Sequence, residues 1–420
     1  MGFLDLLVVA LVPILKVLLV TGVGLFLGIE KINLLGPEAR DYLNKIVFYV
    51  LSPCLLLSNL AETITYKSLV TLWFMPVNVL LTFLVGSALG WILAKLTKTP
   101  RHLQGIVIGC CSTGNLGNLL LIVFPDICDE SNSPFSKLST CSTDAEAYAS
   151  LSMAVGAIFT WAYAYPLVSS YVIKNTEHSS IQSSEPSPDS CTEPLLSPSY
   201  SQISEDNSVV LELPLTNMQD GKKMPFKEKI VRCIKCITSK IDLEKVFVPS
   251  TIASIAGLII GIVSPFRKVL IADNAPLRVI NSSAALIGHV LAGSHSINDL
   301  DNGGKPFKRL FQCLKRSEMS LVVILGVVAV RNICLPLLGI GVVQAAHHLG
   351  VVGSDALYRF VLMFQYAVPP AINVGTMTQL FKSGQGETSV ILLWSYSVAS
   401  ISLTLWSTLY MSLVSNSSTK

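Results

Sequence analysis

Residues 364–380 read FQYAVPPAINVGTMTQL, and this stretch decides how the chain has to fold. Long apolar sequence lies on both sides of it, yet two adjacent prolines, Pro369 and Pro370, are followed by Asn373 and Gly375. Proline removes a backbone donor, glycine loosens a helix, and asparagine brings an amide into hydrocarbon. Each of these residues costs free energy in a membrane helix, so we expect the cluster to serve a purpose.

The composition of the whole chain indicates a membrane protein. Of its 420 residues, 51% are hydrophobic and 14% are charged, and the mean hydropathy is +0.58. A soluble protein would carry about a quarter charged residues. The apolar residues form continuous blocks, and a helix needs about 20 such residues to cross a bilayer. We therefore predict an all-α polytopic membrane protein, because a β-barrel would show alternating polarity instead.

Ten transmembrane helices are expected from these blocks. They cover approximately residues 6–28, 42–60, 69–94, 103–124, 146–172, 246–264, 275–292, 319–343, 356–381 and 388–413. Residues 175–221, between the fifth and sixth spans, are rich in Ser, Pro, Glu and Asp, which predicts disorder. The sequence KKMPFKEKIVRCIKCITSK follows and suits a short helix on an anionic membrane surface.

This pattern divides the chain into three parts. We expect an N-terminal five-helix repeat over 1–173, a disordered loop ending in the basic amphipathic segment over 174–245, and a C-terminal five-helix repeat over 246–420. Five is an odd number, so the second half enters the membrane in the opposite orientation, as in a 5+5 inverted repeat.

The positive charges of the loops predict the orientation. The loops after the first, third, fifth, seventh and ninth spans, together with Lys45 at the start of the second span, hold 21 of the 30 Lys and Arg residues. By the positive-inside rule, the central loop is cytosolic and both termini are lumenal or extracellular. Cys128 and Cys141 share a short loop on the non-cytosolic side, where a disulfide is compatible with an oxidising compartment.

The fourth span of each half is interrupted. Span 4 reads CCSTGNLGNLLLIVFP and span 9 reads YAVPPAINVGTMTQLF. Paired Gly/Pro/Asn breaks at matching positions of two inverted halves are the best sequence indication of a transporter's substrate site. The first spans of the two halves share a weaker similarity, the small-xxx-small spacing of Gly24 and Gly28 in span 1 and of Gly257 and Gly261 in span 6. Close helix packing is an equally good explanation of this spacing.

Where two such spans unwind and cross, the N-termini of their second halves would point inward. Unpaired N–H groups and the helix dipole make such ends suitable for anions, and amide side chains add neutral donors. We predict a substrate site formed by Asn115, Asn118 and Asn373, with Pro370 holding the break. The alternative for any one asparagine is an ordinary hydrogen bond between helices.

Other residues in the spans have candidate roles. Lys16 in span 1 and Arg331 in span 8 are charges at membrane depth, with a structural pair, a side chain reaching water or substrate contact as alternatives. One structural role for Arg331 is to cap a carbonyl freed by a kink at nearby Pro336. Leu55 and Leu56 follow a proline in span 2 and are candidates for an apolar wall of the site, with core packing as the alternative.

Several chemistries have no support in the sequence. No Asp or Glu lies deep in an expected span, so coupling through a buried carboxylate has no candidate. Cys233 and Cys236 form a CxxC without a second ligand pair nearby, and we predict no metal and no cofactor. No enzyme motif lies within the spans and nothing indicates a nucleic-acid partner, so the expected partners are the bilayer and a small organic anion, with a homodimer left open.

Three stretches resemble a known family. They are LVPILKVLLVTGVGLFLG, STGNLGNLLLIVFPDIC, and LYRFVLMFQYAVPPAINVGTMTQLF with the following SVASISLTLWSTLYM. The chain is similar to the PIN-LIKES family of plant auxin-transport facilitators, relatives of the PIN-FORMED efflux carriers. The resemblance implies a multi-pass carrier of the endoplasmic-reticulum membrane that moves auxin, an aromatic carboxylate, from the cytosol into the lumen. It also implies an elevator-type mechanism, in which helices 4 and 9 cross at prolines and the carboxylate is held near the crossing, partly by asparagine. In this chain the residues that match these roles are Asn115, Asn118, Pro370 and Asn373.

One segment departs from the family pattern. From Gly288 the chain reads GHVLAGSHSINDLDNGGKPFKRLFQCLKR, which puts polar residues where members of the family continue span 7. Span 7 is therefore atypical, and residues 288–316 put transport competence in doubt. Two alternatives to the auxin carrier remain open. One is a sodium-coupled organic-anion symporter, and the other, which the atypical span 7 keeps open, is a membrane receptor or scaffold that binds auxin without moving it.

Overall fold

A computed structural model describes residues 2–27, 37–136, 139–171, 247–271, 279, 282–284, 319–381 and 383–417. The central loop and nearly all of the expected span 7, together with the divergent segment after it, lie outside these residues, as do Gly28, Cys233 and Cys236. Within them the chain is helical, and its one β-type pairing is an isolated bridge between Gly114 and Pro370.

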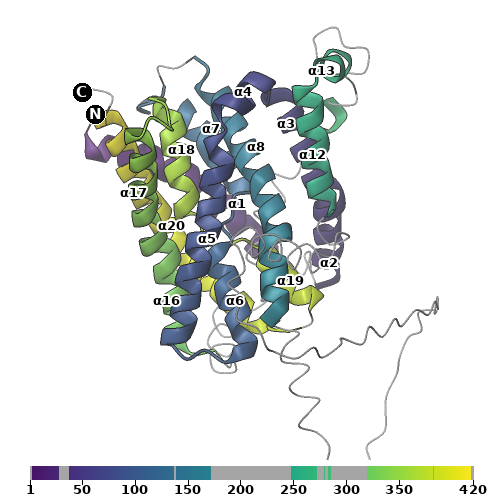
Figure 1. Ribbon diagram of the computed structural model, residues 1–420, viewed down its shortest axis with the longest axis vertical. Coiled ribbons are helices and arrows are strands. Elements are labelled where there is room, and N and C mark those ends of the chain that lie inside the picture. The colour runs from purple at the N-terminus through teal and green to yellow at the C-terminus, as the bar shows by residue number, and fades with distance from the viewer. Residues whose placement is uncertain are drawn as a thin grey trace, which may run out of the picture. The chain divides into compact units, whose positions relative to one another are not determined.

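The helices of the first half run back and forth along one bundle (Figure 1). In chain order they are α1 (Phe3–Leu27), α2 (Pro37–Ile46), the π-helical turn η1 (Val47–Leu51), α3 (Ser52–Thr63), α4 (Tyr66–Thr71), α5 (Phe74–Leu96), α6 (Arg101–Ser112), α7 (Asn118–Asp129), α8 (Cys141–Phe159) and η2 (Thr160–Ala164).

The helices of the second half complete the bundle. They are α12 (Pro249–Ile262), α13 (Ser264–Leu270), α16 (Leu321–Ala329), η3 (Val330–Cys334), α17 (Leu335–His348), α18 (Ala356–Ala367), α19 (Asn373–Leu380) and α20 (Gln385–Ser417). The nine expected spans other than span 7 coincide with helical stretches, with ends shifted by a few residues.

The chain is a multi-pass helical membrane protein. Among the described residues, four helical stretches are long and apolar enough to cross a membrane: 74–96, 141–171, 321–348 and 385–415. The pair α12 and α13 would add a fifth span and is bent by 98° at its break. Spans 4 and 9 are not single rods, because each is divided into two short helices at the predicted place, α6 with α7 and α18 with α19.

The two ends of the bundle carry different parts of the chain. The start of α1 and the end of α20 lie at the same end, which also carries α4 and α13 (Figure 1). The turn between α5 and α6 and the start of α16 lie at the opposite end. This alternation agrees with an even number of passages between the two termini.

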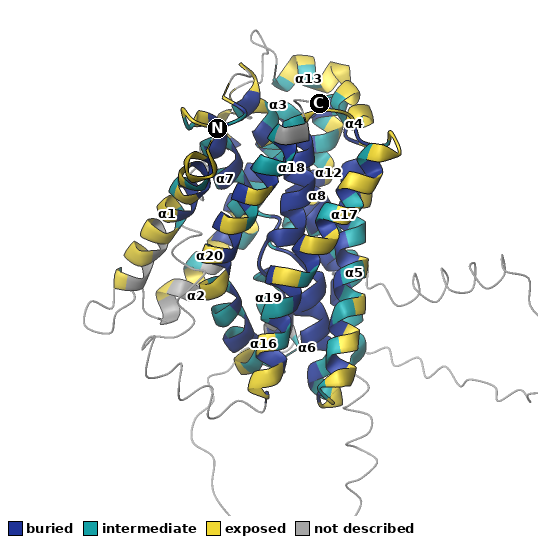
Figure 2. Cartoon of the chain, turned by 90° about the vertical axis from the view of Figure 1, so that its left-hand side faces the viewer, coloured by how far each residue is buried: buried dark blue, intermediate teal, exposed yellow. Residues whose placement is uncertain are grey.

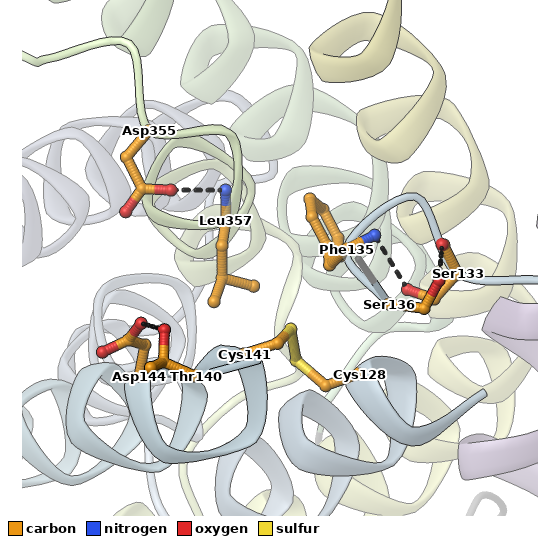
Figure 3. The surroundings of a disulfide bond; sticks show 9 residues. All are labelled: Cys128, Ser133, Phe135, Ser136, Thr140, Cys141, Asp144, Asp355 and Leu357. Carbon is orange, nitrogen blue, oxygen red and sulfur yellow. Dashed lines mark hydrogen bonds between the residues drawn. A yellow bond between two sulfur atoms is a disulfide. The ribbon is translucent and has the colours of Figure 1, made fainter. Parts of the chain in front are cut away.

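A disulfide closes the turn between α7 and α8. Cys128 in the last turn of α7 is bonded to Cys141 at the start of α8, with 5.7 Å between the two Cα atoms (Figure 3). Asp355, the N-cap of α18, lies close by and accepts hydrogen bonds from the Leu357 N–H at 3.0 Å and from the Tyr148 hydroxyl at 2.8 Å. The disulfide therefore belongs to the end of the bundle where the α17–α18 turn also lies.

The core is built around α5, α8 and α18, whose facing sides are buried, whereas the outer sides of α1 and α17 remain exposed (Figure 2). Small residues allow the closest contacts. A Cβ atom at Gly257 of α12 would lie 2.9 Å from the Leu57 carbonyl oxygen of α3, and one at Gly261 would collide with the Ile64 carbonyl oxygen. The small-xxx-small spacing of span 6 thus serves the packing of α12 on α3.

This contact predicts a stability difference between two glycines. We expect Gly261→Ala to destabilise the protein by about 1–3 kcal/mol, because overpacking against backbone forces α12 and α3 apart. Gly341→Ala on α17 is the matched control, because its Cβ would meet nothing within 4 Å. Thermal unfolding of the purified variants measures both, and equal melting temperatures would contradict the packing argument.

Candidate functional site at the crossing of two broken helices

The two interrupted spans meet where they unwind. Thr113, after α6, and Val368, after α18, have extended backbone conformations. The segments that follow them pair antiparallel: the Asn115 N–H donates to the Pro369 carbonyl at 2.8 Å, and the Ala371 N–H donates to the Thr113 carbonyl at 2.9 Å. The predicted breaks are therefore present and in contact.

The pairing explains why two prolines are tolerated here. In an antiparallel ladder, a residue pair without direct hydrogen bonds lies between pairs that have them. Gly114 and Pro370 form such a pair, so the bonds on either side use the Pro369 carbonyl and the Ala371 N–H. No proline N–H is required, and the prolines prevent the helix from continuing.

Arg331 holds the crossing together. It lies in η3 with none of its surface exposed, and it donates to three carbonyl oxygens of the broken segments. Nη1 lies 3.2 Å from the Cys111 oxygen, and Nη2 lies 3.0 Å from the Thr113 oxygen and 3.1 Å from the Pro369 oxygen. A helix that ends leaves carbonyls without partners, which is costly in hydrocarbon. The planar guanidinium donates to carbonyl oxygens of both broken spans at once.

This finding revises the expectation for Arg331. Its partners are not carbonyls freed at Pro336 in its own span, but carbonyls of α6 and of the Val368–Pro370 segment. Residue 114, which faces the guanidinium, has to be glycine, because a Cβ at Gly114 would lie 2.6 Å from Arg331 Nη2. In the sequence, the charge at membrane depth was the signal for a special role of Arg331. Its acceptor carbonyls could not be identified there, because Pro369 and Thr113 lie 38 and 218 positions away along the chain.

Asn115 makes a second polar link across the crossing. Its Nδ2 donates to the Tyr396 hydroxyl at 2.7 Å, and that hydroxyl donates to the Pro370 carbonyl at 3.1 Å. Asn115 Oδ1 accepts from the Gly117 N–H at 3.3 Å. Tyr396 of α20 was not predicted from the sequence, where a single tyrosine in an apolar span gives no signal. Both side chains are only partly buried.

The second halves of the two broken spans start beside the crossing. α7 begins at Asn118 directly after Gly117, and α19 begins at Asn373, two residues after Ala371. The Asn373 side chain is partly buried, and within the described part of the chain its amide forms no hydrogen bond. In these first turns the Leu120, Val374 and Gly375 N–H groups already donate to the Gly117, Ala371 and Ile372 carbonyls. The donors expected for an anionic group are therefore the Asn373 amide and the N–H groups at the very start of the two helices. The roles of Asn115, Asn118, Pro370 and Asn373 in binding remain predictions.

Leu55 and Leu56 lie on α3 and are 5% and 2% exposed. They belong to the main hydrophobic core, where α3 packs against α12 and α8. Their predicted place as an apolar wall of the site is not tested by this geometry.

Lys16 forms an ion pair with Asp126 of α7, with 3.0 Å between Nζ and the nearer carboxylate oxygen. The side chains are 53% and 24% exposed. The expected span 4 ends at residue 124, whereas α7 continues to Asp129 and includes Asp126. The Lys16 charge therefore has a structural partner on another helix.

A buried polar network ties α5, α8 and α18 together near the break. Asn78 Nδ2 donates to Gln365 Oε1 at 2.7 Å, and Gln365 Nε2 donates to the Ser152 hydroxyl at 2.8 Å. The Tyr366 hydroxyl donates to Asn78 Oδ1 at 3.3 Å. Hydrogen-bonded amides at this depth hold the three helices in register.

Comparison with known proteins shows which family the chain belongs to. A family model described as "Membrane transport protein" matches residues 9–407. Protein PIN-LIKES 1 of Arabidopsis thaliana is 45% identical over 414 residues, covering 99% of this chain and 81% of the relative. The chain belongs to the PIN-LIKES family.

Two further PIN-LIKES proteins of Arabidopsis thaliana match along their whole length. PIN-LIKES 3 is 44% identical over 98% of this chain and 99% of its own, and PIN-LIKES 7 is 42% identical over 99% and 100%. As a member of a membrane transport family, this PIN-LIKES protein is a transporter and not an enzyme.

The Arg331 contacts generate a prediction about stability. Arg331→Met leaves three buried carbonyls without the guanidinium, and each uncompensated group costs about 1–3 kcal/mol. We expect a loss of several kcal/mol, visible as a strongly lowered melting temperature. Arg331→Lys should be intermediate, because an ammonium keeps the charge but not the fork that reaches both segments. A melting temperature of Arg331→Met equal to that of the unchanged protein would contradict the assigned role.

Proposed function

We propose that this PIN-LIKES protein is a carrier for an organic anion, most specifically auxin (indole-3-acetic acid), and that it moves this anion from the cytosol into the lumen of the endoplasmic reticulum. The observation that carries the proposal is the antiparallel contact between the two broken spans, with two helix N-termini and the Asn115 and Asn373 amides beside it. The aromatic substrate and the organelle rest on the family resemblance.

The chemistry of the crossing suits a ligand that must be released again. Helix N-termini and neutral amides offer several weak donors to a carboxylate. The one full positive charge at the crossing, Arg331, donates to three carbonyls and is fully buried. A substrate carboxylate therefore meets partial charges instead of a salt bridge, which favours turnover over tight retention.

The proposed architecture is a 5+5 inverted repeat of ten transmembrane helices that works as an elevator. The crossing, the Asn78–Gln365–Ser152 network and Tyr396 join α5, α6, α8, α18 and α20 by hydrogen bonds, which supports their movement as one block. α3 and α12 pack against each other through glycine contacts and would belong to the fixed part. α1, which packs on α20 and α7, would also be fixed, with the moving block sliding against it. The Lys16–Asp126 pair would then restrain the two parts until the block moves.

The proposed orientation has the central loop in the cytosol and both termini in the lumen. The Cys128–Cys141 disulfide supports it, because disulfides persist in oxidising compartments such as the endoplasmic-reticulum lumen. The positive-inside count and the disulfide are independent observations, and both support a non-cytosolic position for the same end of the bundle.

Uptake into proteoliposomes tests the site directly. Asn373→Ala removes an amide that forms no hydrogen bond in the described part of the chain, so the fold should be unaffected. We expect uptake of labelled indole-3-acetic acid to fall about tenfold or more, the equivalent of one charge-assisted hydrogen bond. Its melting temperature should equal that of the unchanged protein.

Asn332→Ala is the matched control for this experiment. Asn332 is also an amide in mid-span, but its Nδ2 donates to the Val328 carbonyl of its own span. Uptake by this variant should stay within a factor of about two of the unchanged protein. Equal uptake by Asn373→Ala and Asn332→Ala would refute the site, whereas saturable binding without uptake by the unchanged protein would refute the carrier and favour the receptor.

Tyr396→Phe tests the part of the site that the sequence did not reveal. Removing the hydroxyl breaks its bonds to Asn115 and to the Pro370 carbonyl, and frees the Asn115 amide to rotate. We expect the Michaelis constant for indole-3-acetic acid to rise several-fold, because the donor is no longer pre-oriented. Initial uptake rates over a range of substrate concentrations measure this, and an unchanged constant would show that Tyr396 does not position Asn115.

A further inference from the structure

Two short helices, α4 and α13, lie across one end of the bundle. α4 follows α3 and α13 follows α12, and both stand at the end that carries the start of α1 and the end of α20 (Figure 1). The axis of α13 is bent by 98° from that of α12, and Figure 2 shows it running crosswise over the end of the bundle. Because the long helices cross the membrane, an element at right angles to one of them runs along the membrane plane.

The crosswise position of α13 is fixed by Arg267. Its Nη2 donates to the Glu62 carbonyl at 3.0 Å, and its Nη1 lies 3.4 Å from the carbonyl oxygens of both Ile64 and Gly261. These carbonyls belong to the last turns of α3 and α12 and to the residue after α3, where helix ends leave acceptors without helical partners. One side chain of α13 therefore bonds to the ends of both helices, and α13 is a fixed part of the α3–α12 pair.

The outward side chains of the two short helices are largely apolar. No residue of α4 or α13 is buried. Phe266 and Val269 are three residues apart on α13, and Tyr66 and Val70 are four apart on α4, so each pair shares one face of its helix. Their exposed fractions lie between 40% and 65%. Facing water, these side chains would lose the free energy that apolar surface gains by leaving it.

This apolar surface continues a ridge along α12. The exposed residues of that ridge follow each other at helical spacings of three or four; they are Ile252, Ile255, Ile259 and Val263. In a membrane-spanning bundle such a ridge faces acyl chains. Val263 is the N-cap of α13, and Phe266 comes three residues later. The lipid-facing surface therefore passes around the bend onto α13 at the end of the bundle.

The polar residues of these helices suit the depth of the head groups. Lys67 on α4 and Lys268 on α13 are exposed, and neither helix contains Asp or Glu. A lysine can lay its apolar stem on hydrocarbon and extend its ammonium to phosphate. Trp73, between α4 and α5, is also exposed, and Trp and Tyr are enriched where the membrane meets water.

We propose that α4, Trp73 and α13 form an anchor in the head-group layer of one leaflet, with Tyr66, Val70, Phe266 and Val269 inserted among the upper acyl chains. The partner is the phospholipid interface and not a second copy of the chain, because neither helix offers a carboxylate to the lysines of a copy, whereas phospholipid phosphates do. Since Arg267 joins α13 to the ends of α3 and α12, the anchor holds this helix pair at a fixed depth.

Photo-crosslinking of the whole protein in phosphatidylcholine nanodiscs tests the proposal. Benzoylphenylalanine replaces Phe266 or, in a separate variant, Val70, and the mass of the irradiated protein is then measured. We expect an adduct heavier by one phospholipid at both positions, with a yield about tenfold or more above that of the control, because an inserted side chain is surrounded by lipid. The control carries the same probe in place of Asn132, an exposed residue of the polar turn between α7 and α8 at the same end.

Two results overturn the proposal. One is a crosslink to a second copy of the chain at position 266 or 70, which would make this surface a protein interface. The other is a lipid adduct at either position with a yield no higher than that at position 132, which would place the side chain in water. Both probe positions are exposed, so the probe displaces no core residue, and neither readout depends on transport of any substrate.

Discussion

Everything at the centre of this protein depends on backbone carbonyls that have lost their helical partners inside a membrane. Breaking two helices in hydrocarbon is costly unless each freed group finds another partner. The antiparallel pairing of the two segments satisfies some of these groups, and the Arg331 guanidinium satisfies three carbonyls from both segments. Because one side chain from a third span serves both breaks, neither break can close without disturbing the other.

The same constraint determines what the crossing offers a ligand. Carbonyls of the first half-helices are occupied by the bridge and by Arg331, while the second half-helices begin beside them at Asn118 and Asn373. Acceptors are therefore consumed on the side of the first half-helices, and the Asn373 amide is a donor on the side where the second half-helices begin. This asymmetry favours an anion over a cation. The network of Asn78, Gln365 and Ser152 keeps the surrounding helices in register, so the donors stay in place.

The sequence predicted the elements that depend on local chemistry. Prolines, glycines and asparagines in an apolar span mark a break wherever they occur, so the interruptions in spans 4 and 9 could be located and their meeting anticipated. Partners that depend on three-dimensional placement could not be anticipated. Tyr396 has no special feature in the sequence, and its role comes from the hydrogen bond with Asn115. Asp126, the partner of Lys16, lies beyond the expected end of span 4. Arg331 was expected to serve a carbonyl near Pro336, whereas its acceptors are distant along the chain.

A structure of the protein in lipid nanodiscs with indole-3-acetic acid present, determined by electron cryo-microscopy, tests the central claim most directly. The account predicts ligand density at the crossing, with the carboxylate within hydrogen-bonding distance of the Asn115 or Asn373 amide and of the first turn of α7 or α19. It also predicts that Arg331 keeps its three carbonyl partners and does not contact the ligand. Ligand density away from the crossing, or a direct salt bridge between Arg331 and the carboxylate, would contradict the account.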